Sequence, residues 1–571
     1  MVAPAGHRTG RWASSPRGGR AATHGGPGDN VPMNTHLPHP SARQPVLARN
    51  IVSTSQPLAS QAGAAAFARG GNAIDAVLAA AITLTVVEPV MNGIGGDGFA
   101  LVWDGQSLQG LNASGRSPQA WNAERFAHLA QMPTLGWESV TVPGAVSGWV
   151  ALSARYGALP FADLFKDAVR HARDGFPVSP TIARQWAMQT PELHAQPGFA
   201  AAFMPGGRAP RASEIWRFAD QATTLSDIAA TGGESFYRGR LAAAITSYAS
   251  VHGGALSMQD LADHRVEWVT PIQTAFRGHA VHEIPPNGQG IAALMALGIL
   301  EHLPYAETPI GSAARMHLEI EAMRVAFADL QTHVADAAHM RVTTAQLLSS
   351  AYLRQRARLI DPQRAGQHAP GQPASGGTVY LCAADVQGRM VSYIQSNYKG
   401  FGSGVVVPGT GIAMHNRGFG FVTTPGHVNE VAGAKRPLHS IIPAFMTRVD
   451  GAGAHHAAMA FGVMGGNMQA QGHTQMVLRR VVEGLNPQAC SDAPRWRIND
   501  AGVLTLERGV PSHVVEGLIA MGHSPLVAAA DSLDFGSAQL IAALGGDDVG
   551  PGEIAYVAGS DHRRDGQAVG C

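Results

Sequence analysis

The step from Gly377 to Thr378 is where residue types and spacing in this chain best suit covalent chemistry. A threonine hydroxyl is a weak nucleophile and needs a base within hydrogen-bond reach. If the chain cleaves itself before Thr378, the new α-amino group, with a pKa of about 7.7–8.0, places that base on the same residue. A Gly-Gly-Thr step before a strand also occurs in simple turns, so the local sequence leaves both interpretations open.

A nucleophile of this kind also needs donors for the oxyanion, and backbone N–H groups in a glycine-rich turn supply them. The adjacent Gly465 and Gly466 follow an apolar, strand-like segment at residues 457–461. Two glycines in a row allow a backbone in which consecutive amides face one point. We expect an oxyanion hole here, with a purely structural turn as the alternative. Two rival motifs, the G-x-S-x-G elbow and the Walker loop, are absent from the sequence.

Strand signals follow Thr378 directly. Residues 379–384 and 390–395 are strand-like and flank a turn signal at residues 385–388. This pattern predicts a β-hairpin. Residues 361–377 form a polar linker without hydrophobic periodicity. A segment of this composition is exposed, as a cleavage loop must be.

Helical periodicity dominates the first two thirds of the chain. Residues 56–87 predict two helices separated by a break at residues 70–72. Residues 180–330 look mainly helical, and residues 474–483 and 513–521 predict helices in the last third. Helices and strands in both halves favour an α/β or α+β layered fold.

A glycine run at residues 93–98 formally matches G-x-G-x-x-G. A dinucleotide fingerprint follows a strand and opens a helix, whereas here a helix precedes and a strand follows. We therefore interpret the run as a turn or a place of close backbone packing.

Composition excludes several classes of protein. The chain of 571 residues has 41 basic and 41 acidic side chains, so it has no strong field to attract nucleic acid or an anionic membrane. Its three cysteines, Cys382, Cys490 and Cys571, do not fit a disulfide framework or the usual zinc spacing. We expect no metal and no organic cofactor.

The beginning of the chain does not look like a folded part. Residues 1–45 are rich in Pro, Gly, Arg and His without an apolar run, which predicts a disordered extension rather than a secretory signal. Met33 is an alternative start. The longest apolar segment, residues 73–87, is shorter than the ~20 residues of a membrane span. The expectation is a cytoplasmic protein.

The sequence resembles the γ-glutamyltransferase (glutathione hydrolase) family of N-terminal-nucleophile hydrolases over residues 48–571. The resemblance rests on short matches in the family's order, at residues 70–76, 87–89, 93–99, 142–144, 286–290, 401–404, 435–437 and 465–466. It implies an α+β fold, a four-layer αββα sandwich, self-cleaved into two intertwined subunits. These subunits are a large one, residues 46–377, and a small catalytic one, residues 378–571.

The resemblance also implies roles for individual residues. In the family the proenzyme cuts before a threonine seven residues ahead of a strand-ending aspartate, and seven residues before Asp385 lies Thr378. The cut then falls between Gly377 and Thr378. Ser396 stands where the family has a hydroxyl that hydrogen-bonds the nucleophile, and the Gly465–Gly466 pair matches the oxyanion hole.

Departures from the family pattern concern the substrate. Ser440 matches one of two consecutive serines that hold the substrate carboxylate, and His439 replaces the other. Ser114 stands in place of the substrate-binding arginine, with Arg116 as the nearest guanidinium. Gly420 stands in place of the acidic residue that binds the substrate's α-amino group.

Further candidates for contacts with substrate lie near these positions. Tyr398 replaces a family asparagine and Asn397 is adjacent to it, while Arg417 and Arg436 are further candidates to bind a carboxylate. Residues 421–435 form a shorter segment than in typical members, so we expect the lid over the site to be missing. An open site favours water as the acyl acceptor.

Together these features predict a self-processing threonine amidohydrolase that cleaves γ-glutamyl or related carboxylate-bearing amides through an acyl-enzyme, with hydrolysis favoured over transpeptidation. An acylase of the glutaryl-cephalosporin type or an amidohydrolase of the oxamate type is the alternative, and a non-catalytic binding relative is a third. The expected partners are the two subunits of one precursor. Their association into a homodimer of heterodimers is left open.

Overall fold

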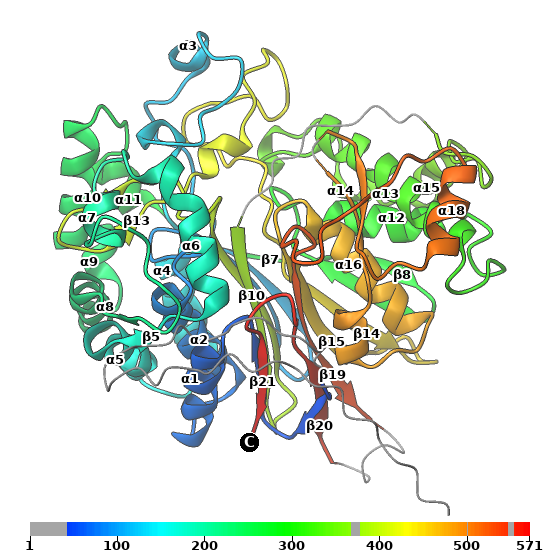
Figure 1. Ribbon diagram of the computed structural model, residues 1–571, viewed down its shortest axis with the longest axis horizontal. Coiled ribbons are helices and arrows are strands. Elements are labelled where there is room, and N and C mark those ends of the chain that lie inside the picture. The colour runs from blue at the N-terminus through cyan, green and yellow to red at the C-terminus, as the bar shows by residue number, and fades with distance from the viewer. Residues whose placement is uncertain (1–42, 367–376, 500, 546–552) are drawn as a thin grey trace, which may run out of the picture. The chain divides into compact units, whose positions relative to one another are not determined.

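Two seven-stranded sheets lie face to face at the centre of the structure, which is a computed structural model (Figure 1). The structure describes residues 43–366, 377–499, 501–545 and 553–571. Neighbouring strands in both sheets are antiparallel. The first sheet has the order β21 (Gln567–Gly570), β2 (Ile51–Thr54), β10 (Gly377–Ala384), β11 (Met390–Tyr398), β3 (Asp97–Trp103), β4 (Leu108–Asn112) and β7 (Glu267–Val269). The second has the order β1 (Val46–Ala48), β20 (Ala555–Gly559), β19 (Ser537–Leu544), β15 (His455–Met464), β14 (Ala444–Val449), β9 (His279–Glu283) and β8 (Ile272–Phe276).

Helices cover the outer face of each sheet, on the left and right of Figure 1. The layer on the first sheet contains α1 (Pro57–Ala68), α2 (Ala73–Val87), α4 (Ala145–Tyr156), α5 (Lys166–Asp174), α6 (Pro180–Leu193), α7 (Phe199–Phe203), α8 (Ala219–Thr231), α9 (Glu234–Tyr237), α10 (Arg240–Val251) and α11 (Met258–Asp263). The layer on the second sheet contains α12 (Ile291–Leu300), α13 (Ala313–His333), α14 (Thr344–Leu347), α15 (Ser350–Ala357), α16 (Met468–Val481), α17 (Pro487–Asp492) and α18 (Ser512–Ala520). The fold is therefore the expected αββα sandwich of the α+β class.

Short elements complete the chain. These are α3 (Ala123–Phe126), the 3₁₀ helices η1 (Trp137–Ser139), η2 (Phe161–Phe165), η3 (Ala337–His339) and η4 (Arg417–Gly420), and the strands β5 (Phe176–Pro177), β6 (Ile215–Trp216), β12 (Val406–Val407), β13 (Ile412–Ala413), β16 (Trp496–Ile498), β17 (Leu504–Leu506) and β18 (Leu526–Val527).

Strand β10 is buried on both faces because its side chains alternate between two cores. Val379 and its odd-numbered neighbours pack toward α2, and Tyr380 and its even-numbered neighbours pack toward the second sheet. The ring of Tyr380 lies so close to β15 that a Cβ at Gly462 would be 2.4 Å from it. This two-sided burial explains the nearly continuous apolar run after Thr378.

The turn after β10 is tied to the start of α2. A carboxylate oxygen of Asp385 accepts from the backbone N–H of Ala73 at 3.0 Å, and the other accepts from backbone N–H groups inside the turn. Asn72 and Asp75 form a capping box at the same helix end. The N-terminus of a helix favours a carboxylate, so Asp385 fixes the helix layer against the hairpin.

Most expected elements are present. The helices at residues 56–87, with their break, and the hairpin of β10 and β11 are confirmed. Residues 180–330 are mainly helical, as expected, because α6 to α13 cover more than half of them, but they also contain the strands β7, β8 and β9, which were not expected. These strands are short, and β8 alternates with polar and exposed residues, so their apolar signal is weak.

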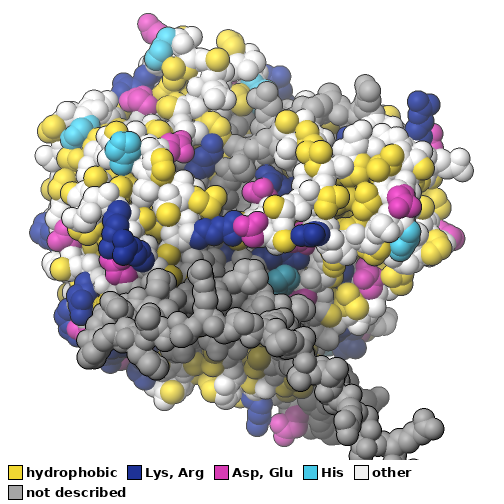
Figure 2. Space-filling model, viewed as in Figure 1, with side chains coloured by type: hydrophobic (Ala, Val, Ile, Leu, Met, Phe, Trp, Pro, Cys, Tyr) yellow, Lys and Arg dark blue, Asp and Glu magenta, His cyan; other side chains and the backbone are white. Residues whose placement is uncertain are grey.

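The expected subunit boundary does not separate two folding units. Residues 43–571 form one compact unit, in which β10 lies between β2 and β11. Nearly all of the expected extension at residues 1–45, and the linker from residue 367 to residue 376, lie outside the described residues. Figure 2 shows acidic and basic side chains interspersed over the viewed face, in keeping with the balanced charge. Among the described residues, no helix is long and apolar enough to cross a membrane.

Candidate active site

Thr378 lies near the start of β10, buried between the two sheets. Its Oγ1 donates to Ser396 Oγ at 3.3 Å and accepts from Gln469 Nε2 at 3.4 Å. Ser396 comes from β11 and Gln469 from the first turn of α16, so a neighbouring strand of the same sheet and a helix position one hydroxyl. The site thus places the expected nucleophile and the expected hydroxyl partner within hydrogen-bond distance.

The side chain of Ser396 is fixed by the backbone two residues later, because its Oγ accepts from the N–H of Tyr398 at 2.7 Å. Asn397 points to the opposite face of β11, where its amide packs against the 93–98 turn. A Cβ at Gly93 or Gly96 would lie 2.8 Å from an amide atom of Asn397. Asn397 is therefore not brought to Thr378, and the glycine run serves close packing.

The Gly465–Gly466 pair follows the end of β15. Both residues have positive φ, 121° and 61°, a conformation that favours glycine. Neither N–H donates to an acceptor within the described part of the chain. Gly465 and Thr378 line the same cavity of about 270 Å³. Gly465 therefore lies at the cavity of the expected nucleophile, whereas Gly466 is not among the residues that line it, and the pair is a candidate for the oxyanion hole.

A second, larger cavity of about 690 Å³ lies beside the first, and Lys399 lines both. Ser440, His439 and Tyr398 also line the larger cavity. The smaller cavity, which Thr378 lines, is also lined by three cationic side chains, Lys399, Arg497 and Arg564, and by one carboxylate, Asp534. The positive excess suits an anionic substrate.

Arg417 is a buried cation behind Ser440. Its Nη1 donates to Ser440 Oγ at 2.9 Å, and its guanidinium lies over the ring of Tyr398. Burial lowers the pKa of Arg417 to about 10, which leaves it charged at neutral pH. Its Nε and Nη2 have no hydrogen-bond partner among the described residues. This arrangement orients Ser440 and adds positive charge where a carboxylate would bind.

His439 is held by Asp97 instead of presenting a free polar group. Its Nδ1 accepts from the N–H of Ile441, so its Nε2 carries the proton and donates to Asp97 Oδ2 at 3.0 Å. The other carboxylate oxygen of Asp97 accepts from the N–H groups of Gly115 and Gly144. Burial raises the pKa of Asp97 to about 7, and burial lowers that of His439 well below its usual range.

Arg116 is not brought to either cavity. It is partly exposed and pairs with Asp336 at 3.1 Å and Glu267 at 3.2 Å. Arg436 pairs with the same Glu267 at 2.6 Å and donates to the carbonyl of Ser114. Ser114 is buried in a network of amides and lines neither cavity. Of the candidate arginines, Arg417 is the one in contact with Ser440.

The position of Gly420 has no room for an acidic side chain. A Cβ there would lie 2.5 Å from the carbonyl oxygen of Leu438. Among the described residues, no Asp or Glu lines the larger cavity. Part of its wall is the segment after Gly420, residues 421–424 together with His427 and Asn429.

Two glutamines of the site were not expected from the sequence. Gln469 donates to Thr378, as described above. Gln289 donates through Nε2 to the carbonyl oxygens of both Ser440 and Gly466. Gln289 belongs to the 286–290 family match, and Gln469 follows Gly466 by three residues. Both glutamines therefore lie in or beside motifs that the sequence analysis had singled out.

Fold and site together define an N-terminal-nucleophile amidohydrolase. The family model described as "Gamma-glutamyltranspeptidase" matches residues 59–571, and the chain belongs to this family. It is therefore an enzyme of the hydrolase and acyltransferase type that the sequence predicted.

Individual relatives carry several related names. The chain is 34% identical to the glutathione hydrolase-like YwrD proenzyme of Bacillus subtilis, over 78% of this chain and 85% of that protein. It is 35% identical to the oxamate amidohydrolase proenzyme of Klebsiella pneumoniae, over 85% of this chain and 92% of that protein. The solved cephalosporin acylase of Bacillus halodurans superposes with a TM-score of 0.88 at 43% identity, covering 95% of this chain and 99% of that one.

Proposed function

We propose that this chain is a threonine amidohydrolase that cuts itself between Gly377 and Thr378 and then releases carboxylate-bearing acids from their amides. The observation that carries the proposal is the position of Thr378, whose hydroxyl lies between Ser396 and Gln469 in the cavity that Gly465 also lines. The proenzyme names of the relatives support a single precursor that yields two subunits. These would be residues 46–377 and 378–571.

The proposed reaction uses Thr378 as both nucleophile and base. Thr378 Oγ1 attacks the amide carbonyl carbon while the α-amine of the same residue takes the hydroxyl proton. The N–H groups of Gly465 and Gly466 stabilise the oxyanion. The amine then protonates the leaving nitrogen, the C–N bond breaks, and an ester on Thr378 remains. Water, deprotonated by the same amine, attacks the ester carbonyl, the bond to Thr378 Oγ1 breaks, and the amine returns the proton to that oxygen as the acid leaves.

The acyl group is selected by its carboxylate. Ser440, which lines the larger cavity, binds it, and Arg417, which lines neither cavity, orients Ser440 from behind and supplies positive charge. Lys399 adds positive charge at the junction of the two cavities. The missing acidic group around Gly420 leaves nothing of opposite charge for an α-ammonium in the larger cavity, as far as the described residues show. Acids with a carboxylate and no α-amino group, as in glutaryl amides, therefore fit this site at least as well as γ-glutamyl amides.

The lack of an acidic side chain for an α-ammonium group favours the acylase or oxamate-type alternative over strict γ-glutamyl specificity. The similarity to a cephalosporin acylase and an oxamate amidohydrolase supports it, whereas the glutathione hydrolase-like relative supports γ-glutamyl amides. Water as acceptor, the pairing of two heterodimers and the cytoplasmic location stay predictions.

Two measurements test the proposal. Mass spectrometry of the purified protein should find a fragment that begins at Thr378, and Thr378→Ala should leave one uncut chain. Rates are then compared on glutaryl-p-nitroanilide, γ-glutamyl-p-nitroanilide and oxamate. Activity on the γ-glutamyl compound alone would refute the proposed selectivity. An uncut, inactive wild-type chain would favour the non-catalytic interpretation.

A further inference from the structure

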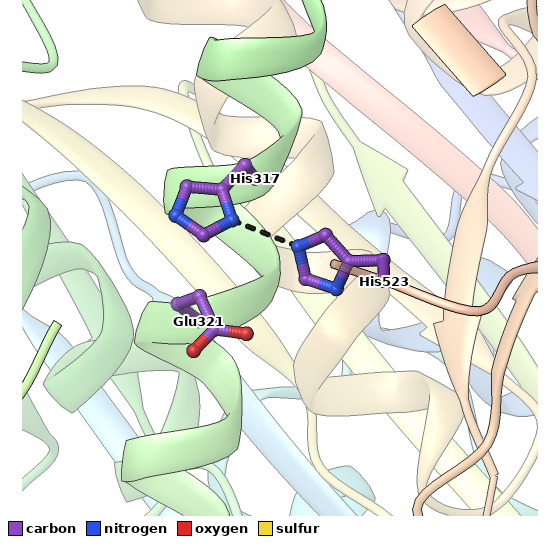
Figure 3. Close-up of side chains that lie close together, drawn as sticks. All are labelled: His317, Glu321 and His523. Atoms are coloured by element: carbon purple, nitrogen blue, oxygen red, sulfur yellow. Dashed lines mark hydrogen bonds between the residues drawn. The ribbon is translucent and has the colours of Figure 1, made fainter. Parts of the chain in front are cut away.

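Three buried metal-ligand side chains meet on the far side of the second sheet from Thr378. His317 and Glu321 lie one turn apart on α13, and His523 follows the end of α18 (Figure 3). One ligand atom from each residue lies within 4.8 Å of those from the other two. The side chains are nearly inaccessible, with exposed fractions of 0% for His317 and 4% for His523. None of the three lines either cavity of the candidate active site.

Backbone contacts orient these side chains toward one another. His317 Nε2 lies 2.8 Å from the carbonyl oxygen of Asp361, which only accepts, so Nε2 carries the proton. The lone pair of Nδ1 therefore faces His523 Nε2 at 2.8 Å. Glu321 accepts from the N–H of Gly366 at 2.9 Å through one carboxylate oxygen. A ligating histidine that donates its second N–H to a carbonyl is the usual outer-shell arrangement of metal sites.

We infer that His317 Nδ1, His523 Nε2 and a carboxylate oxygen of Glu321 bind one divalent transition-metal ion of the zinc class. Two imidazoles and a carboxylate are ligands that Zn²⁺ accepts, with a fourth position left to water. Zn–N bonds of about 2.0–2.1 Å hold two nitrogens ~3.3 Å apart on a tetrahedral ion. The two imidazoles must therefore separate slightly from their present contact. Binding displaces the proton from His523 Nε2, and His523 stays neutral because its ring then carries one proton on Nδ1.

The ion would join segments from both sides of the proposed cut. His317 and Glu321 precede Thr378 in the chain, and His523 follows it. The stretch from Asp361 to Gly366, which bonds to His317 and Glu321, also donates from Ala365 N to the carbonyl oxygen of Met521 at 2.8 Å. The joining of two subunits rests on the proposed function, whereas binding of the ion does not.

The competing explanation is that these side chains only hydrogen-bond to one another, without a metal ion. Another histidine of the chain shows such a pair. His562 pairs with Asp492 at 3.0 Å on the surface, without a third ligand. Within the described residues, His317, Glu321 and His523 are the one group of three in which a ligand atom of each lies within 4.8 Å of those of the other two. A metal site requires several buried ligands and is typically oriented by a backbone hydrogen bond such as that of His317. A surface pair such as His562 and Asp492 lacks both features.

The test uses the full-length protein without a histidine tag, freed of metal by chelator and titrated with Zn²⁺. Native mass spectrometry and calorimetry should show one tightly bound ion per chain in the wild type and in His562→Asn, the matched control. Glu321→Gln and His523→Asn should weaken binding at this site by more than the roughly 10–100-fold that loss of an outer-shell partner costs. Equal tight binding by the wild type and Glu321→Gln, or no tight binding by the wild type, overturns the inference.

Two further measurements keep the test independent of folding and of catalysis. X-ray absorption of the zinc-loaded wild type should show two imidazole ligands, and a spectrum with none overturns the inference even if His523→Asn does not fold. Thr378→Ala should bind the ion as the wild type does, because the site does not depend on the cut. Failure of the proposed function would leave this result unchanged.

Discussion

The guanidinium of Arg417 lies over the ring of Tyr398, with its Cζ 4.6 Å from the ring centroid. A cation over the face of an aromatic ring is stabilised by the ring quadrupole, most strongly when both are withdrawn from water. Tyr398 has a positive φ of 80°, an uncommon conformation for a non-glycine residue, at the end of the strand that carries Ser396. The stack therefore links the strand beside the nucleophile to the residue that orients Ser440.

Replacing Arg417 should weaken substrate binding more than turnover. Arg417→Gln removes a charged hydrogen-bond donor worth ~1.5–3 kcal/mol, so KM for a carboxylate-bearing amide should rise about 10- to 100-fold. The matched control is Arg116→Gln, which removes a partly exposed arginine from an ion-pair network outside both cavities. Steady-state kinetics on the preferred anilide give KM and kcat for the two variants and the wild type. A larger KM effect from Arg116→Gln would move the carboxylate-binding role back to Arg116.

An acidic residue introduced at position 420 should not create γ-glutamyl selectivity. In Gly420→Asp the new Cβ would lie 2.5 Å from the carbonyl oxygen of Leu438, so the backbone must shift. Overpacking of this kind costs about 1–3 kcal/mol of unfolding free energy. Gly451→Asp, where a Cβ meets nothing within 4 Å, is the control. Chemical denaturation and the ratio of rates on γ-glutamyl and glutaryl anilides are measured, and a stable variant with a raised ratio would contradict the prediction.

Loss of the Ser396 hydroxyl should slow both self-cleavage and turnover. Ser396→Ala removes the acceptor for Thr378 Oγ1 and for the N–H of Tyr398, and leaves a buried donor without this partner. The cost of about 1–3 kcal/mol corresponds to roughly 10- to 100-fold in rate. Ser392→Ala, on the same face of β11 but bonded to Tyr380, should cleave normally. Gel densitometry over time and kcat give the comparison, and equal behaviour of the two variants would exclude the positioning role.

Glu88 should make the precursor less stable as pH rises. This carboxyl at the end of α2 accepts from Ser55 Oγ at 2.5 Å, and burial raises its pKa from 4.5 to about 7, opposed by Ser55 and Arg564. Between those two pH values the folded state keeps a proton that the unfolded state has lost, so unfolding free energy falls with rising pH and levels off above about 7.

Glu88→Gln removes this titration. Relative to the variant, the wild type should lose ~3 kcal/mol between pH 4.5 and pH 8. Urea unfolding is best followed in a Thr378→Ala background, so that one uncut chain unfolds, with Glu516→Gln at an exposed glutamate as control. Parallel pH profiles of Glu88→Gln and the wild type would show that the carboxyl is not the cause.

The contact between Thr378 and Ser396 was expected from the family resemblance, and the local periodicity explains it. Alternation along β10 and β11 and the turn at Asp385 define a hairpin whose pairing sets the two hydroxyls side by side. The same period of two separates Ser396 from Asn397, which is adjacent in sequence and lies on the other face of the sheet. The sequence shows which side chains of a strand share a face, but it does not show which other segments pack against that face.

The carboxylate-binding residues were harder to predict because they depend on contacts between distant segments. Arg116 and Arg417 look alike in the sequence, and burial against Tyr398 distinguishes them only in the folded chain. The spacing of His317 and Glu321 puts both on one helix face, but His523 lies 206 residues from His317 and no local pattern predicts their meeting. The strands β7 to β9 were missed for the weaker reason that they are short and partly exposed.

The amide of Gln289 has a consequence for the length of the acid that the site accepts. Its Nε2 donates to the carbonyl oxygen of Ser440, the serine proposed to bind the carboxylate, and to the carbonyl oxygen of Gly466, at the proposed oxyanion turn. One planar group therefore sets the separation between the point that holds the far end of the acyl chain and the point where its carbonyl reacts. Neither end can shift without breaking a bond to the same nitrogen. In the proposed function, the number of methylene groups between the two carbonyl carbons of the acid would therefore have to match this span.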